Sequence, residues 1–115
     1  MIEDGQVVLF RFPTSDLKAG KLRPALVIRK LPGEYDDWLI CMISSQLGRA
    51  IQGFDEIVRT DDPDFRDSGL KTESVVRVFR LAVVEREVLL GAVGAIGSER
   101  LARIRTTLSA WIGST

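Results

Sequence analysis

Residues 23–28 read Arg-Pro-Ala-Leu-Val-Ile, a charged side chain and a proline followed by four consecutive apolar residues. A short apolar run bounded by turn-forming residues is typical of a buried β-strand. The polar segment 14–22 precedes this run, and a Leu-Pro-Gly turn signal follows it at residues 31–33. The stretch therefore predicts a core strand over residues 24–29, with Arg23 at its entrance.

Two further stretches also set polar groups beside apolar strands. Residues 43–46 read Ile-Ser-Ser-Gln and follow an apolar run, while residues 74–78 read Ser-Val-Val-Arg-Val and place a second arginine inside another run. A sheet that joins these strands can gather two guanidinium groups and two hydroxyl groups. Such a set suits an anionic ligand such as a phosphodiester, which planar guanidinium groups bind through paired hydrogen bonds.

The remaining chain predicts a small, mainly β domain. Four or five short strands are expected, at residues 6–12, 24–29, 38–43, 54–58 and 75–81. The glycine-rich segment 91–97 lacks the spacing of a nucleotide-binding loop and predicts a turn.

The C-terminal segment changes to a helical period. Leu101, Ile104 and Leu108 recur every three or four residues and describe the apolar stripe of one helix. Ser98 is its expected N-cap and Gly113 its expected end. We therefore expect one domain over residues 1–115, mainly β with α, in which a bent antiparallel sheet or barrel packs against a C-terminal helix. The two tryptophans are expected in the core or in a dimer interface.

The composition excludes much ordinary enzyme chemistry. The 115 residues include no histidine, which removes the commonest general base and metal ligand. The single cysteine, Cys41, lies in an apolar run and predicts a buried thiol in a reducing compartment. Sixteen basic and sixteen acidic residues give no net charge, which argues against indiscriminate coating of nucleic acid but leaves room for a local basic groove.

No metal, cofactor or membrane segment is expected. The acidic run at residues 61–67 lacks the ligand spacing of a calcium loop. The N-terminus is acidic, and no apolar run approaches the roughly 20 residues of a membrane span. A cytoplasmic protein is therefore predicted.

The ordered set of stretches resembles the MazF/PemK toxins over nearly the whole chain. The resemblance rests on KLRPALVI at residues 21–28, ICMISSQ at 40–46, DSGLKTESVVRV at 67–78, and a glycine-rich segment before an amphipathic helix. It implies an SH3-like barrel with a helix, the fold that MazF and CcdB share. It also implies the toxin of a type II toxin-antitoxin pair, a homodimer that a cognate antitoxin protein neutralises.

The same resemblance implies a sequence-specific endoribonuclease that needs no metal or cofactor. In such enzymes the ribose 2′-hydroxyl of single-stranded RNA attacks the adjacent phosphorus, leaving a 2′,3′-cyclic phosphate and a 5′-hydroxyl. The protein then has mainly to stabilise charge and move protons.

Motif matching assigns residues to roles. Arg23, Ser44 and Arg77 match the catalytic positions of the family, and Ser45 matches an RNA-binding position. Further RNA contacts are expected from Gln46, Lys18, Lys21 and Arg11.

One position departs from the pattern. PemK-type members usually carry an acidic residue two positions after the second arginine, and here Phe79 stands there. On a regular strand Phe79 would point to the same side as Arg77, so an apolar ring replaces the expected general base. Asp16 is the substitute that we predict as a catalytic residue.

Other interpretations stay open at this stage. Arg23 could be a solvated strand end, the serines a simple turn, and Arg77 half of a surface ion pair that contributes only about 0 to 1 kcal/mol. A CcdB-like toxin that poisons DNA gyrase would share the fold without requiring Arg23 or Ser44. The substitution at Phe79 also allows a weakened homologue that binds RNA or antitoxin without rapid cleavage.

Overall fold

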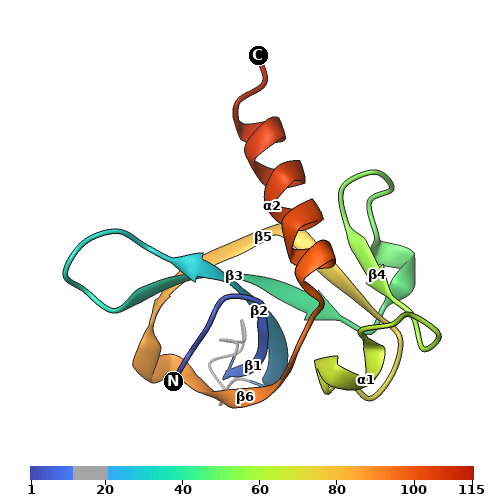
Figure 1. Cartoon of the computed structure of the whole chain (residues 1–115), viewed down its shortest axis with the longest axis horizontal. Coiled ribbons are helices and arrows are strands. Elements are labelled where there is room, and N and C mark those ends of the chain that lie inside the picture. The colour runs from blue at the N-terminus through green and yellow to red at the C-terminus, as the bar shows by residue number, and fades with distance from the viewer. Residues whose placement is uncertain (12–20) are drawn as a thin grey trace.

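The computed structural model describes residues 1–11 and 21–115, and within them the chain forms one antiparallel sheet with a long C-terminal helix (Figure 1). The strands are β1 (Gln6–Arg11), β2 (Leu22–Lys30), β3 (Asp37–Ser44), β4 (Glu56–Val58), β5 (Ser74–Glu85) and β6 (Leu89–Ala95). The helices are the short α1 (Phe65–Ser68), the long α2 (Ser98–Ile112) and two 3₁₀ turns, η1 (Leu47–Arg49) and η2 (Arg86–Val88). The expected class, mainly β with a C-terminal helix, is confirmed.

The sheet has the strand order β4-β5-β3-β2-β1-β6, and every pairing in it is antiparallel. The strands predicted from β-type patterning are all present, although β2, β3 and β5 extend beyond the predicted bounds. The β5 strand is the longest, and its residues beyond Leu81 pair with the beginning of β3. Strand β3 thus pairs along its whole length with β5 on one side, and over residues 38–42 with β2 on the other.

The turn predicted at residues 91–97 is wrong, because most of this segment forms the edge strand β6. Its glycines interrupt the alternation of apolar and polar residues that marks a strand, but the backbone conformation and packing of β6 require them. Gly91 has φ 135°, which favours glycine, and the register between β6 and β1 shifts at two points. A Cβ added at Gly94 would lie 2.2 Å from the carbonyl oxygen of Asp67, so glycine lets α1 approach β6 closely. The α1 segment therefore covers β6.

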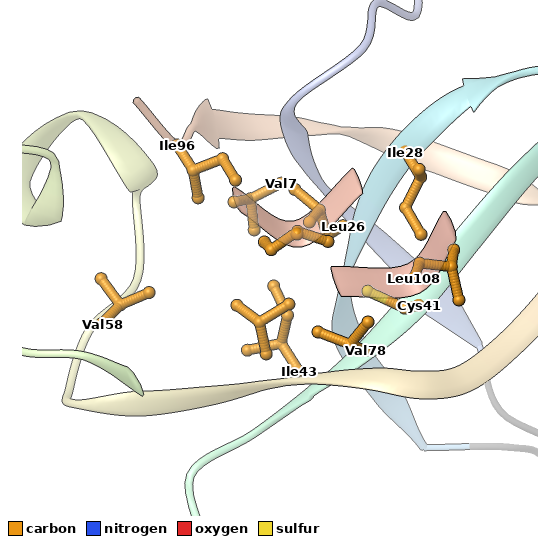
Figure 2. Packing of buried hydrophobic residues seen from close by; sticks show 11 residues of the cluster. Val7, Leu26, Ile28, Cys41, Ile43, Val58, Val78, Ile96 and Leu108 are labelled. Carbon is orange, nitrogen blue, oxygen red and sulfur yellow. The ribbon is translucent and has the colours of Figure 1, made fainter. Parts of the chain in front are cut away.

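The apolar residues form two clusters. The larger cluster includes Val7, Leu26, Cys41, Ile104 and Leu108. Figure 2 shows how side chains of the strands, such as Leu26 and Cys41, pack near Leu108 of α2. The smaller cluster packs on the other face of the sheet and consists of Ile2, Val8, Ala25, Val27, Trp38, Ile40 and Leu89. Strand β2 therefore contributes alternate residues to two different clusters, as a strand buried on both faces must.

Helix α2 begins at Ser98, with Gly97 rather than the predicted Ser98 in the cap position, and ends as predicted at Gly113. The N–H of Gly97 donates to Asp64 Oδ2 at 2.9 Å. The C-terminal end of α2 projects beyond the sheet (Figure 1), and Trp111 there is 55% exposed, whereas Trp38 is buried in the core. None of the helices in the described part of the chain is both long and apolar enough to cross a membrane.

One buried arginine ties the start of α2 to the acidic segment. Arg100 donates to Asp64 at 2.8 Å, to Asp62 at 2.9 Å and to Glu56 at 3.1 Å, and its side chain is only 8% exposed. The Arg100 guanidinium holds the pKa of Asp64 below its ordinary value. The carboxylates of Asp62 and Asp64 thus serve as partners of an internal cation.

We predict that Gly94→Ala lowers the free energy of unfolding by about 1–3 kcal/mol, because the new methyl group must displace backbone atoms of α1. Gly48→Ala is the matched control, since no atom lies within 4 Å of a Cβ at that position. Its effect should stay within about 0.5 kcal/mol. Urea unfolding measures both, and equal midpoints for the two variants would contradict the close approach of α1 and β6.

We predict that Arg100→Ala lowers the free energy of unfolding at pH 7 by about 3 kcal/mol, because it removes the buried cation that three partly buried carboxylates share. The control is Arg103→Ala, which removes an arginine that also pairs with Glu56 but has a 54% exposed side chain. That variant should lose no more than about 1 kcal/mol.

The same cluster predicts a dependence on pH. A carboxyl group whose pKa is lowered in the folded state stabilises the fold above its unfolded pKa, about 3.9 for aspartate. That contribution from Asp64 is lost as the pH falls through its lower folded-state pKa. Urea unfolding at a series of pH values should therefore show wild-type stability falling below about pH 4, with a shallower fall in Arg100→Ala. Parallel curves would show that Asp64 is not held by Arg100.

Candidate functional site

Three polar side chains share one face of the sheet, as the registers of β2, β3 and β5 indicate. Ala25 of β2 pairs with Met42 of β3, and Met42 pairs with Arg77 of β5. Residues directly opposite each other point to the same face, as do residues two positions apart along a strand. Two positions beyond the Ala25–Met42 pair, this register sets Arg23 beside Ser44. We call Arg23, Ser44 and Arg77 the polar face.

The polar face lies on the side of the sheet that α2 does not cover. Ala25 and Met42, which share its direction, pack in the smaller cluster, whereas Ile104 and Leu108 of α2 pack in the larger cluster on the opposite side. Ser44 and Arg77 are diagonal neighbours across β3 and β5, with Cβ atoms expected to be about 7–8 Å apart. Both arginine side chains are long enough to reach a ligand held at Ser44.

Arg23 offers an exposed guanidinium. It lies on β2 opposite Phe10 of β1, and no carboxylate in residues 1–11 or 21–115 forms a salt bridge with it. An exposed guanidinium without a salt bridge can use its planar set of N–H donors to bind an anion through two hydrogen bonds.

Ser44 ends β3 and is half-buried. Its Oγ accepts a hydrogen bond from the backbone N–H of Gln46 at 3.1 Å, which fixes the hydroxyl at the bend after the strand. A hydroxyl that accepts one hydrogen bond still has its own proton to donate. Ser45 and Gln46 follow at this bend with exposed side chains.

Arg77 is more enclosed than Arg23. Its side chain is 17% exposed, and its Nε lies 3.9 Å from Oδ2 of Asp55, whose side chain is only 1% exposed. The predicted alternative of an ion pair for Arg77 is thus present, but the carboxylate is a buried one. Sequence patterns did not single out Asp55, because one acidic residue before a short strand carries no recognisable spacing.

Strand β5 bulges immediately after Arg77. One step along β3, from Cys41 to Met42, corresponds to four steps along β5, from Leu81 to Arg77. The residues between, 78–80, therefore lack partners on β3.

The bulge changes the direction of Phe79. The ring of Phe79 packs against Trp111 and Phe54, with centroid distances of 4.8 and 5.5 Å, and against the larger core cluster. The strict alternation expected for Arg77 and Phe79 is therefore interrupted. Both residues nevertheless line one hollow, together with Asp55, Arg80 and Ile51.

The other predicted RNA contacts are dispersed. Lys21 is exposed and directly precedes β2. Arg11 pairs with Leu22, next to the Phe10–Arg23 pair, so its side chain is expected on the opposite face of the sheet from that of Arg23. It lines a separate hollow with Val83 and Glu85. Asp16 and Lys18 lie outside the described residues.

Cys41 is fully buried in the larger cluster, and burial raises the pKa of its thiol, with a further contribution from the charge of Asp55. A thiol that cannot ionise is a poor nucleophile. In the described ranges, no group of three or more acidic, cysteine or histidine side chains is arranged to hold a metal ion.

With this geometry in place, the comparisons with known proteins assign the chain to a class. Residues 3–112 match the family described as the PemK-like, MazF-like toxin of type II toxin-antitoxin systems. Because the match spans nearly the whole sequence, the chain belongs to this toxin family, and the resemblance noted from its motifs is confirmed.

Solved structures support the fold. A MazE–MazF complex from Deinococcus radiodurans contains a chain that is 18% identical, with a TM-score of 0.68 over 99% of this chain and 97% of that one. An endoribonuclease in complex with its cognate antitoxin, from a mycobacterial species, is 15% identical, with a TM-score of 0.65 over 100% and 98% of the two chains. At such identities the likeness shows the fold alone. No curated protein gives a significant sequence match.

We predict that the Cys41 thiol of the folded protein does not react with a thiol reagent such as Ellman's reagent at pH 8, and that it reacts fully in denaturant. The reason is its burial and raised pKa. Absorbance at the wavelength of the released thiolate measures both states. Rapid reaction of the native protein would show that Cys41 is accessible and could take part in chemistry.

Proposed function

We propose that this toxin is a metal-independent endoribonuclease that cleaves single-stranded RNA, with mRNA as the cellular target. The observation that carries the proposal is the polar face, since the strand registers set Arg23, Ser44 and Arg77 on one side of the sheet, which α2 leaves uncovered. Its donors suit a phosphodiester, and the chemistry needs no group beyond side chains and the substrate's own hydroxyl.

In the proposed reaction the ribose 2′-oxygen forms a bond to the adjacent phosphorus while the bond from phosphorus to the 5′-oxygen breaks. Negative charge grows on the non-bridging oxygens as the phosphorus becomes five-coordinate. Arg23 would place its planar fork on these oxygens, and Ser44 would donate one more hydrogen bond. Arg77 would stabilise the departing 5′-oxygen, which takes up a proton from water as a 5′-hydroxyl forms.

The 2′-hydroxyl must also lose its proton. Asp55, which lines the hollow beside Arg77, is poorly placed to receive it, since its side chain is 1% exposed and both oxygens already accept backbone N–H groups. Asp16 remains the proposed base. The products would be a 2′,3′-cyclic phosphate and a 5′-hydroxyl.

This route explains a preference for RNA over DNA, since only RNA carries the internal nucleophile. We propose that Ser45 and Gln46, at the bend beside Ser44, contact the nucleotides next to the scissile phosphate. Lys18, Lys21 and Arg11 would contribute phosphate contacts further along the strand.

We further propose that the protein acts as a homodimer and that a cognate antitoxin inhibits it. Both solved relatives described above are complexes with an antitoxin. Exposed apolar side chains of β5, η2 and β6 offer a surface that a second copy could bury: Val83, Val88, Leu90 and Val93. An acidic antitoxin segment over Arg23 and Arg77 would block RNA by occupation, and its association should weaken with salt.

We predict that the purified protein cuts a long single-stranded RNA at restricted sites in excess EDTA, and that the new 5′-ends carry hydroxyl groups. Arg23→Ala should lower the cleavage rate at least about 100-fold, the scale of losing one donor to a developing oxyanion. Arg29→Ala is the matched control, since it removes an exposed arginine from the opposite end of the same strand. The loss of intact RNA with time gives the cleavage rate of each variant, and mapping of the 5′-ends gives the positions of the cuts.

The outcomes of that experiment separate the alternatives. Equal loss in both variants would mean that Arg23 contributes only general charge. RNA binding without cleavage by the folded wild-type protein would contradict the nuclease and favour the weakened homologue, for which Phe79 is the structural reason. Neither binding nor cleavage would favour a target other than RNA.

A further inference from the structure

Resting on this proposed function, we infer that Asp55 is a positioning residue for the reaction, one that acts on substrate only through Arg77. It pairs with the Arg77 guanidinium and also accepts a hydrogen bond from Val78, the first residue of the β5 bulge that follows Arg77. No sequence motif assigned Asp55 a role.

Asp55 lies directly across from Arg77. Glu56 of β4 pairs with Val76 of β5, and one further step in the same register sets Asp55 opposite Arg77. The Asp55 side chain turns inward, where it is 1% exposed, and its Oδ2 lies 3.9 Å from Arg77 Nε. The carboxylate is therefore almost fully buried beside the guanidinium.

The same carboxylate binds two backbone groups. Its Oδ1 accepts from the N–H of Val78 at 3.0 Å, and its Oδ2 accepts from the N–H of Ile51 at 2.9 Å. Val78 is the first residue of the bulge, where pairing with β3 stops. An unpaired backbone N–H in the interior would cost free energy, and Asp55 satisfies this one.

Burial of a lone carboxylate is strongly unfavourable, so the arrangement depends on all three partners together. In return, the Asp55 carboxylate hydrogen-bonds the backbone next to Arg77 and lies within ion-pair distance of its guanidinium. The closest approach to Asp55 is through Nε, which leaves the two terminal Nη groups of Arg77 for a phosphate oxygen. A long side chain fixed in this way loses less conformational entropy when substrate binds.

The contacts of Asp55 also argue against a role as general base. Both carboxylate oxygens are occupied by N–H donors, and the group is covered. Substrate would meet Arg77, not Asp55.

The test compares Asp55→Asn with wild type on an RNA oligonucleotide that contains one cleavable site. We expect kcat to fall at least about 10-fold and KM to change less than about 3-fold, because the guanidinium is misplaced mainly in the transition state. In an Arg77→Ala background, Asp55→Asn should cost less than a further 2-fold, as expected for residues acting in one unit. Full additivity would overturn the inference.

Asp36→Asn is the matched control. Asp36 also pairs with a cation, Lys30 Nζ at 3.9 Å, and also accepts a hydrogen bond, from Trp38 Nε1 at 2.8 Å, but it directly precedes β3, at the opposite end of that strand from Ser44. Its kcat should equal that of wild type. An Asp55→Asn enzyme that is as active as Asp36→Asn would overturn the inference while leaving the proposed nuclease intact.

A purely structural role is separated by urea unfolding and by solvent exchange of the Arg77 Nε proton in ¹⁵N NMR spectra. Asp55→Asn should remain folded at the assay temperature yet accelerate this exchange, whereas Asp36→Asn should leave it unchanged. Unchanged exchange in Asp55→Asn would overturn the inference even if the wild type cleaved no RNA. If Asp55→Asn fails to fold, Asp55→Glu is used in its place. A kcat of Asp55→Glu equal to that of wild type would also overturn the inference.

Discussion

The register of β3 between β2 and β5 is the constraint on which the rest of the structure depends. Because successive side chains on a strand point to opposite faces, a slip of one residue would exchange Met42 and Ser44 for Cys41 and Ile43. The larger core cluster would then lose two members and the polar face its hydroxyl. Burial on both faces makes such a slip strongly unfavourable, so the packing that stabilises the domain also sets the geometry of the site.

The same residue type serves opposite purposes in different parts of this fold. Arg100 is enclosed by carboxylates and ties α2 to the acidic segment, whereas Arg23 stands exposed and without a salt bridge in the described part of the chain. Arg77 is intermediate, held by one buried carboxylate with its outer nitrogens left available. A net charge of zero thus conceals a segregated distribution in which most acidic groups near α2 are already paired. Such segregation would allow a neutral protein to offer the proposed anion site.

Much of this could be predicted from the sequence, because local patterns report local structure. The apolar runs predicted the positions of the strands, and the three-to-four residue spacing predicted α2. The arginine and serine stretches supplied the residues that the registers set on the polar face. Strand β6 was missed because its glycines interrupt the apolar alternation of a strand. They are required by the close approach of α1 and by the irregular register with β1, which local sequence does not reveal. Asp55, Arg100 and the bulge after Arg77 were missed for the same reason. Each depends on partners far apart in the sequence, which no periodicity reveals.

The central claim is that Arg23, Ser44 and Arg77 converge on one phosphate of a single-stranded RNA. Its most direct test is a crystal structure of the protein with an RNA oligonucleotide made uncleavable by a 2′-deoxy or 2′-methoxy group at the cutting site. The account predicts non-bridging oxygens of that phosphate within hydrogen-bonding distance of both guanidinium groups and of the Ser44 hydroxyl. An RNA that lies along another surface, with its phosphates away from these three side chains, would contradict it.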